Sequence, residues 1–274
     1  MECNRIYLNT PDSFLDTYFL DVSSNMPNSD LRPLVLVCPG GGYLYTSDRE
    51  AEPIALAFAA KGFHAAVLRY PTAPARFPAS LCSLADAMVW LKSHAKEHHV
   101  DPNKIVVSGF SAGGHLAASL GVFWNSDFLQ AQTHYDAEML RPDRLVLGYP
   151  VITSGEFAHR PSFENLLGEN APFDQLNLVS LEKQVSKSTP PTFLWHTCAD
   201  EVVPVENSLL FAQALQRVGV DFELHVYSQG VHGLALSDYT TMDAEGRRVQ
   251  MECTGWVDLA CNWLRQAYPL KKSI

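Results

Sequence analysis

The chain has 274 residues, of which 47% are hydrophobic and 18% charged, so it can bury a sizeable core. Its formal net charge of −10 argues against binding to a nucleic-acid backbone, which requires clustered Lys and Arg. The sequence contains no apolar run of about 18 residues, so no membrane span is predicted, and the first residues lack the pattern of a signal peptide. The six cysteines match neither a zinc site nor a disulfide framework, so we expect reduced thiols, a cytoplasmic location and no bound metal or cofactor.

Short apolar runs alternate with helical stretches along the chain. Strands are expected at 14–22, 33–37, 64–69, 104–108, 145–147, 192–196 and 222–227, and helices at 54–61, 80–96, 206–218 and 254–267. This alternation indicates an α/β fold with a mostly parallel, twisted sheet, helices on both faces and right-handed crossovers. Because no repeat or low-complexity linker interrupts the pattern, we expect residues 1–274 to form a single domain.

Two stretches depart from the alternation. Residues 150–190 contain four prolines, with a fifth at 191, and only short helical patterns, and residues 236–250 are polar. Both follow strands whose carboxyl ends are expected to face the functional site, where irregular insertions serve as lids or substrate walls. We therefore expect a small cap or substrate wall at 150–190. For 236–250, a wall and a passive surface loop are equally good interpretations.

The sequence Gly-Phe-Ser-Ala-Gly at 109–113 is a G-x-S-x-G motif in the context that its chemistry requires. A β-branched strand precedes it at 104–108, and a helical stretch follows it at 114–120. On such a strand-to-helix turn the serine hydroxyl is lifted out of the sheet, and the helix amino terminus faces the developing charge. Ser111 is therefore the predicted nucleophile, and the backbone N–H of Ala112 is one predicted oxyanion donor.

A nucleophilic serine needs a histidine base and an orienting carboxylate, which on this kind of fold follow in the order Ser, acid, His. His232 lies in a glycine-flanked loop after the last strand, whereas His225 lies within that strand and is interpreted as structural. Asp200 and Glu201 both follow the preceding strand. We select Asp200 because it is nearer the strand end.

Three glycines at 40–42 lie in the loop that directly follows the buried strand ending at Val37. Glycines allow a backbone to turn its amides toward a ligand, so this loop is expected to supply the second oxyanion donor. The loop lacks the Gly-Lys-Ser/Thr ending of a phosphate-binding loop.

These motifs together resemble the α/β-hydrolase esterases and lipases with an H-G-G-G-type oxyanion loop, especially the compact acetylxylan-esterase-like sugar-ester hydrolases. The resemblance runs from about residue 30 to the C-terminus and includes the segments 39–43, 109–117, 200–204 and 232–233. It implies that Gly41 and Gly42 are oxyanion donors together with Ala112. Pro39 stands where the wider family has His, which concerns how the loop is braced but not its backbone donors.

Several other side chains are of interest near these motifs. Tyr43, Tyr45 and Trp124 are candidate substrate-binding residues, since sugars stack on aromatic rings. His115 is interpreted as a packed helix residue, and Asp86 is expected to pair with Arg69 in the core.

The resulting hypothesis is a serine carboxylesterase for short acyl groups, with acetyl esters of sugars or xylo-oligosaccharides as the expected substrates. A serine peptidase on the same scaffold is the alternative enzyme, and a non-catalytic ligand-binding protein is the alternative of another class. The expected partner is a small-molecule ester rather than nucleic acid or a membrane. The sequence leaves the oligomeric state open, a homodimer included.

Overall fold

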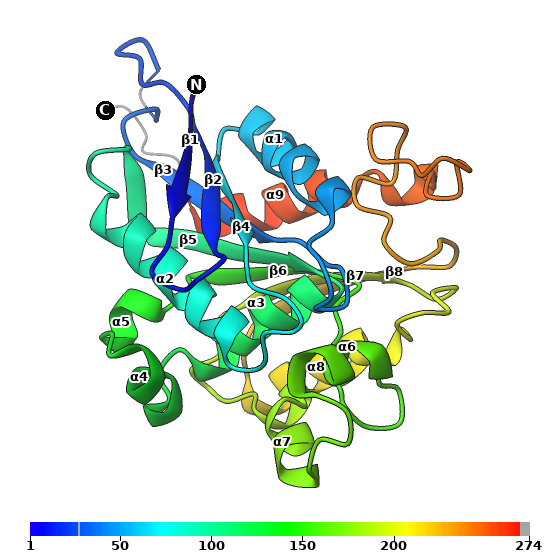
Figure 1. The fold of residues 1–274 in the computed structure, drawn as a ribbon. Coiled ribbons are helices and arrows are strands. Elements are labelled where there is room, and N and C mark those ends of the chain that lie inside the picture. Colours follow the sequence, from blue (N-terminus) through cyan, green and yellow to red (C-terminus); the bar gives the residue numbers. More distant parts are fainter. Residues whose placement is uncertain (27, 269–274) are drawn as a thin grey trace.

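A computed structural model describes residues 1–26 and 28–268, and its centre is an eight-stranded sheet (Figure 1). The spatial order of the strands is β1-β2-β4-β3-β5-β6-β7-β8. Strands β3 to β8 are parallel, whereas β1 pairs antiparallel with β2, and β2 antiparallel with β4. Their bounds are Glu2–Tyr7, Phe14–Phe19, Arg32–Cys38, His64–Arg69, Val100–Phe110, Arg144–Gly148, Thr192–Thr197 and Phe222–Tyr227.

Helices connect the strands and cover both faces of the sheet (Figure 1). The α-helices α1 to α9 are Glu52–Ala60, Ala79–Ser93, Ala112–Phe123, Asp127–Thr133, Ala137–Leu140, Arg160–Leu167, Phe173–Leu178, Glu206–Val218 and Trp256–Ala267. Three 3-10 turns, η1 to η3, cover Asp48–Glu50, Leu181–Lys183 and Met251–Cys253. None of the helices in the described part of the chain is long and apolar enough to span a membrane.

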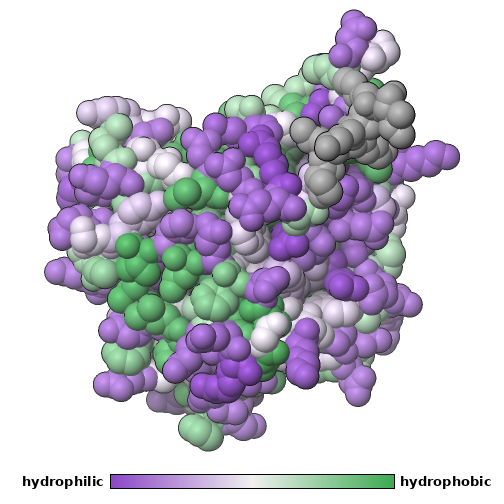
Figure 2. Space-filling model, turned by 180° about the vertical axis from the view of Figure 1, so that it is seen from behind, coloured by the Kyte–Doolittle hydropathy of each residue, from purple (hydrophilic) through white to green (hydrophobic). Residues whose placement is uncertain are grey.

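Alternation along the strands creates two hydrophobic cores. In β3, Leu34 and Leu36 pack with α2, α3 and α8 on one face, whereas Val35 and Val37 pack with α1 and α9 on the other. Because successive strand side chains point to opposite faces, one apolar run fills both cores. Seen from behind, the surface of the molecule is mostly hydrophilic, and apolar side chains gather at its lower left (Figure 2).

The predicted α/β-hydrolase fold is confirmed, with differences at the ends of the elements. The strand expected at 14–22 ends at Phe19, the helix expected at 80–96 ends at Ser93, and β5 begins earlier, at Val100. Strand β1 was not predicted from the sequence, because its mostly exposed, polar residues at the edge of the sheet give little hydrophobic pattern.

The expected pair between Asp86 and Arg69 was wrong. Asp86 instead accepts hydrogen bonds from Thr10 and Tyr135, at 2.7 and 2.8 Å. Arg69 contacts Asp48 at 2.8 Å. Residue type alone does not reveal which of several possible partners each charge contacts.

Candidate active site

Ser111 lies on a sharp turn between β5 and α3, with φ 53° and ψ −123°. This left-handed backbone is strained for a residue with a Cβ, and such strain is concentrated at functional sites. The turn is held by hydrogen bonds from Ser111 N to Gly148 O (3.1 Å) and from Val151 N to Ser111 O (3.0 Å). A Cβ on Gly109 would lie 2.1 Å from the Gly113 carbonyl oxygen, so the turn requires glycine there.

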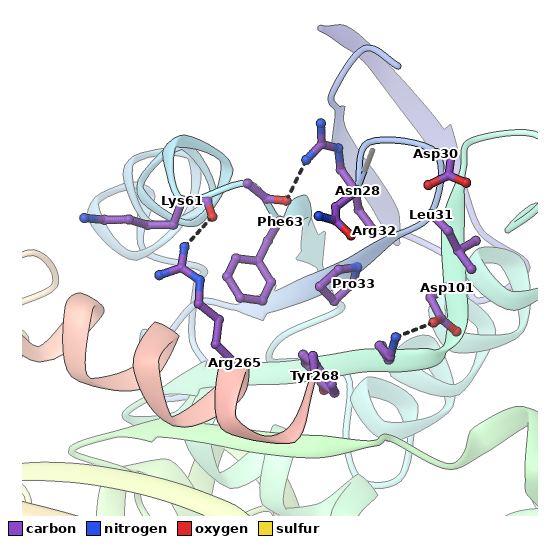
Figure 3. A pocket seen from close by; sticks show the side chains of 12 residues that line it. Asn28, Asp30, Leu31, Arg32, Pro33, Lys61, Phe63, Asp101, Arg265 and Tyr268 are labelled. Carbon is purple, nitrogen blue, oxygen red and sulfur yellow. Dashed lines mark hydrogen bonds and ion pairs between the residues drawn. The ribbon is translucent and has the colours of Figure 1, made fainter. Parts of the chain in front are cut away.

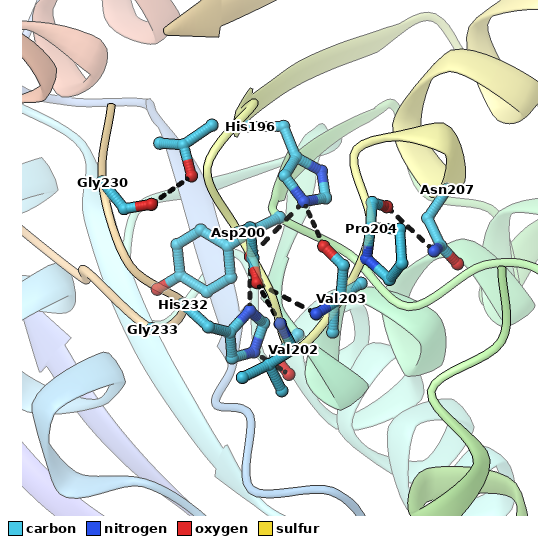
Figure 4. A network of polar contacts seen from close by, with 12 residues as sticks. His196, Asp200, Val202, Val203, Pro204, Asn207, Gly230, His232 and Gly233 are labelled. Atoms are coloured by element: carbon cyan, nitrogen blue, oxygen red, sulfur yellow. Dashed lines mark hydrogen bonds and ion pairs between the residues drawn. The ribbon is translucent and has the colours of Figure 1, made fainter. Parts of the chain in front are cut away.

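The predicted residues Ser111, Asp200 and His232 meet at the carboxyl edge of the sheet. Figure 4 shows His232 and Asp200 within their network of polar contacts. His232 Nε2 is 2.8 Å from Ser111 Oγ, and His232 Nδ1 is 2.6 Å from Asp200 Oδ2. The Asp200 side chain is 1% exposed and that of His232 is 16% exposed. The aspartate is thus enclosed, while the imidazole can reach a bound molecule.

The loop after β7 fixes the Asp200 carboxylate from several sides. Its Oδ1 accepts hydrogen bonds from the backbone N–H groups of Val202 (3.0 Å) and Val203 (2.9 Å). The buried His196 Nε2 lies 3.5 Å from Oδ2. Burial by itself raises the pKa of Asp200, but the contacts with His196 and His232 outweigh it and hold the pKa well below its usual range.

The ionised carboxylate determines which imidazole nitrogen carries the proton. Because Asp200 only accepts hydrogen bonds, His232 Nδ1 must be the protonated nitrogen. Nε2 is then an acceptor for the Ser111 hydroxyl. This arrangement can remove the hydroxyl proton as Ser111 attacks an electrophilic carbon.

The glycine loop lies directly against the Ser111 turn. Gly41 and Gly42 have φ 130° and 63°, and a Cβ on Gly41 would lie 2.1 Å from the Tyr45 carbonyl oxygen. A Cβ on Gly113 would lie 2.1 Å from the Cys38 carbonyl oxygen, so the two backbones touch. Within residues 1–26 and 28–268, no acceptor receives the N–H of Gly41, Gly42 or Ala112, which leaves these donors available.

Glu50 braces this loop from η1, although no sequence signal identified it. Its side chain is buried, Oε2 accepts from Gly40 N at 2.8 Å, and Oε1 accepts from the Tyr149 hydroxyl at 2.7 Å. The Tyr149 oxygen in turn accepts from Ala235 N at 2.9 Å, in the segment that carries His232. One buried carboxylate therefore links the glycine loop to the histidine loop. Tyr149 follows β6 directly. Asp200 was selected because it lies just after the end of a parallel strand, and the same criterion could have identified Tyr149.

A cleft of about 270 Å³ opens over Ser111 and His232. Its other lining residues are Gly41, Gly42, Leu44, Tyr45, Ser47, Arg49, Glu50, His159, Pro161, Asn165, Val202, Gly233 and Arg248. The segment 150–190 contributes three of these residues around α6, and the segment 236–250 contributes Arg248.

Of the three predicted substrate-binding aromatics, only Tyr45 lines the cleft, where it is 60% exposed. Tyr43 was wrongly assigned, because its side chain is buried and its hydroxyl is 2.8 Å from His115 Nδ1. Trp124 was also wrongly assigned. It follows α3 at the end remote from Ser111, and its Nε1 donates to Ser188 O at 2.9 Å.

Two other histidines have the structural positions expected for them. His115 is fully buried and bonded through Nε2 to Val179 O at 2.8 Å, and burial lowers its pKa to about 4. His225 lies in β8 and contacts Glu223 at 2.6 Å. Across the described residues, no group of three or more His, Cys, Asp or Glu side chains is arranged to hold a metal ion.

This sheet order, with a serine on the turn after its fifth strand and an acid and a histidine after its seventh and eighth, defines an α/β hydrolase. The BD-FAE family model matches residues 20–215, and the chain belongs to that family. The resemblance to esterases close to the acetylxylan esterases is thereby confirmed.

Three relatives illustrate this placement. Endo-1,4-beta-xylanase B of Butyrivibrio fibrisolvens is 39% identical over 216 residues, 77% of this chain and 34% of the relative, so this chain spans about a third of that protein. An acetyl ester-xyloside bifunctional hydrolase of Caldicellulosiruptor lactoaceticus has a TM-score of 0.82 at 37% identity, covering 97% and 96% of the two chains. A carboxylesterase of Lactobacillus plantarum has a TM-score of 0.87 at 30% identity and full coverage of both chains.

Proposed function

We propose that this chain is a serine carboxylesterase that hydrolyses short-chain acyl esters, with acetyl esters of sugars or xylo-oligosaccharides as its substrates. The observation that carries the proposal is the continuous chain of short contacts from Ser111 through His232 to Asp200, which opens on a cleft. Those three groups supply a nucleophile, a base and an orienting anion.

In the proposed reaction, Ser111 Oγ attacks the acyl carbon while His232 Nε2 accepts its proton. Asp200 stabilises the resulting imidazolium, and the N–H groups of Gly41, Gly42 and Ala112 hold the oxyanion. His232 then gives the proton to the leaving alcohol, which leaves an acyl-enzyme. Water repeats the sequence and releases the acid.

The size of the cleft supports a short acyl group. At about 270 Å³ it lies below the range of about 300–1,000 Å³ that is typical of ligand pockets. Two of the relatives are named for xylan- or xyloside-related activities, which supports a sugar as the alcohol. The six free cysteines suit the cytoplasm, which keeps thiols reduced.

The test is kcat/KM across p-nitrophenyl acetate, butyrate, octanoate and laurate. Each methylene that fits a pocket contributes about 0.8 kcal/mol, so a long acyl tunnel rewards longer chains. We expect the maximum between acetyl and butyryl and a fall by octanoyl. A maximum at octanoate or beyond would reject the short-acyl assignment.

Two additions to the panel separate the remaining alternatives. Aminoacyl amides test the serine peptidase, and failure of every ester and amide would favour a binding protein on a hydrolase scaffold. Acetylated xylo-oligosaccharides test the sugar. Their rejection by an enzyme that cleaves p-nitrophenyl acetate would remove only that part of the proposal.

A further inference from the structure

Two arginines from distant parts of the chain line the cleft beside the histidine loop. Arg49 lies in η1, and its Nη1 donates to Gly233 O at 2.7 Å. Arg248 Nη1 donates to His232 O at 2.7 Å and to Gly233 O at 3.0 Å. A Cβ on Gly233 would lie 2.3 Å from Arg248 Nη1 and 3.5 Å from Arg49 Nη2. Both guanidinium groups therefore surround one residue, next to His232.

The positive charge at this position is only partly neutralised. Arg248 Nε lies 3.3 Å from Asp243, which Arg247 also contacts at 3.3 Å. Within residues 1–26 and 28–268, no carboxylate lies within 4.0 Å of the Arg49 guanidinium.

Carboxylates that line the cleft do not offset this charge at its surface. Among the described residues the only one is Glu50, which is 3% exposed and already accepts hydrogen bonds at both oxygens. Among its described lining residues, the surface of the cleft thus presents two guanidinium groups and no exposed carboxylate, while the negative charges of Asp200 and Asp243 lie beneath and beside it. Guanidinium groups at the surface of a cleft attract an entering anion.

Tethering the histidine loop does not by itself require these charges. An amide side chain also donates to a carbonyl oxygen without bringing a cation to the cleft. A guanidinium has five N–H donors, of which Arg49 uses one for Gly233. The donors that remain match a carboxylate, for which guanidinium is the best geometric partner.

We propose that Arg49 and Arg248 form an anion subsite, and that the enzyme prefers esters carrying a carboxylate close to the scissile bond, such as acetyl esters of acidic sugars. This inference rests on the proposed esterase function. The carboxylate can belong to the acyl group or to the alcohol, and the test distinguishes the two sources.

The test compares matched pairs of esters that differ in charge but little in shape. The acyl arm pairs mono-p-nitrophenyl succinate with p-nitrophenyl valerate, and the alcohol arm pairs 4-acetoxybenzoate with 4-acetoxybenzamide. We expect the anionic member of at least one pair to have a kcat/KM on the order of tenfold higher, with the ratio falling in about 0.5 M salt.

The variant Arg49→Met is expected to reduce that ratio several-fold, whereas Arg49→Lys keeps most of it. Any general loss from a displaced His232 lowers both members of a pair and cancels in the ratio. Arg217→Met removes an exposed cation from the end of α8 and serves as the matched control. Ratios at or below one in both arms, or a ratio unchanged in Arg49→Met, would overturn the subsite. Failure to hydrolyse any of the four esters would instead overturn the proposed esterase together with it.

Discussion

Two hollows in the described part of the chain lie at opposite ends of the parallel strands, and the larger of the two is not at the candidate active site. A hollow of about 410 Å³ lies at the amino ends, between Arg32, Phe63 and Tyr268 (Figure 3). The cleft over Ser111 lies at the carboxyl ends and measures about 270 Å³.

Their polar groups are used differently. In the larger hollow the two lysines are paired with carboxylates, Lys104 with Asp101 at 2.9 Å and Lys61 with Asp258 at 2.5 Å, whereas Arg265 donates to a backbone carbonyl, that of Lys61, at 2.8 Å. Around the smaller cleft, Ser111 has a strained backbone and Asp200 has a strongly lowered pKa. Since burial also raises the pKa of Tyr268 in the larger hollow, the strained backbone of Ser111 and its contacts through His232 to Asp200 locate the candidate site better than volume does.

The largest loss of kcat is expected from Ser111→Ala, which removes the proposed nucleophile. Loss of a catalytic serine lowers kcat on the order of 10⁴–10⁶-fold. Ser108→Ala, three residues earlier in β5, is the matched control because it removes a buried hydroxyl outside the cleft. Turnover of p-nitrophenyl acetate near the wild-type rate in a folded Ser111→Ala protein would contradict the serine mechanism.

A loss of about 10⁴-fold in kcat is expected for Asp200→Asn, since the imidazole loses the anion that fixes its tautomer. The neighbouring Glu201 is exposed, so Glu201→Gln is expected to have little effect. Steady-state kinetics of both variants check the assignment. The opposite ranking would identify Glu201 as the acid.

Acid is expected to destabilise the packing beneath the cleft through His115. Burial lowers its folded pKa from 6.5 to about 4, so the unfolded state binds a proton that the folded state does not. The free energy of unfolding therefore falls as the pH drops from about 6.5 to about 4, by on the order of 2–3 kcal/mol from this group.

Urea unfolding at pH 7 and pH 4.5 measures that difference. Gln does not titrate, so His115→Gln is expected to be less stable at pH 7 but also less sensitive to acid. An undiminished loss of stability in this variant would assign the effect to other groups. His64, whose pKa burial also lowers to about 4, is the next candidate.

For Glu50→Gln we expect kcat to fall on the order of 10–100-fold with little change in KM, because the oxyanion loop loses its charged brace. The glutamine amide can accept a hydrogen bond from only one of Gly40 N–H and the Tyr149 hydroxyl, and its NH₂ group faces the other. Glu52→Gln, exposed at the start of α1, is the control. An effect confined to KM would place Glu50 in substrate binding instead.

The smallest effect on kcat/KM is expected from a substitution in the larger hollow. Lys104→Met removes a cation that is engaged with Asp101 far from Ser111, so kcat/KM for p-nitrophenyl acetate is expected to change less than about twofold. A tenfold loss would show that the two ends of the sheet are coupled.

Local patterns in the sequence were sufficient to predict the parallel strands β3 to β8 along the chain and three residues, Ser111, Asp200 and His232, that the structure brings within hydrogen-bond distance. The glycine-flanked serine, the acid after β7 and the histidine after β8 are each positioned by the strand before them. The boundaries of α8 and β8 were also predicted, because a capping glycine or a short apolar run marks them.

Contacts between distant segments could not be predicted in the same way. Glu50 and Tyr149 are 99 residues apart, and only the fold brings them together. Aromatic character alone was likewise insufficient to predict which side chains line the cleft. Tyr43 has φ 59° and is buried against His115, while its exposed neighbour Tyr45 lines the cleft.

The contact between the glycine loop and the Ser111 turn has a consequence for how this protein can diversify. With the Gly113 Cβ position 2.1 Å from the Cys38 carbonyl oxygen, neither backbone can change without the other. Recombination with a homologue between residues 42 and 109 therefore separates two segments that must be inherited together. Exposed cleft positions such as Leu44, Tyr45 and Val202 carry no such constraint. Libraries that seek new ester specificities are best directed to those three positions.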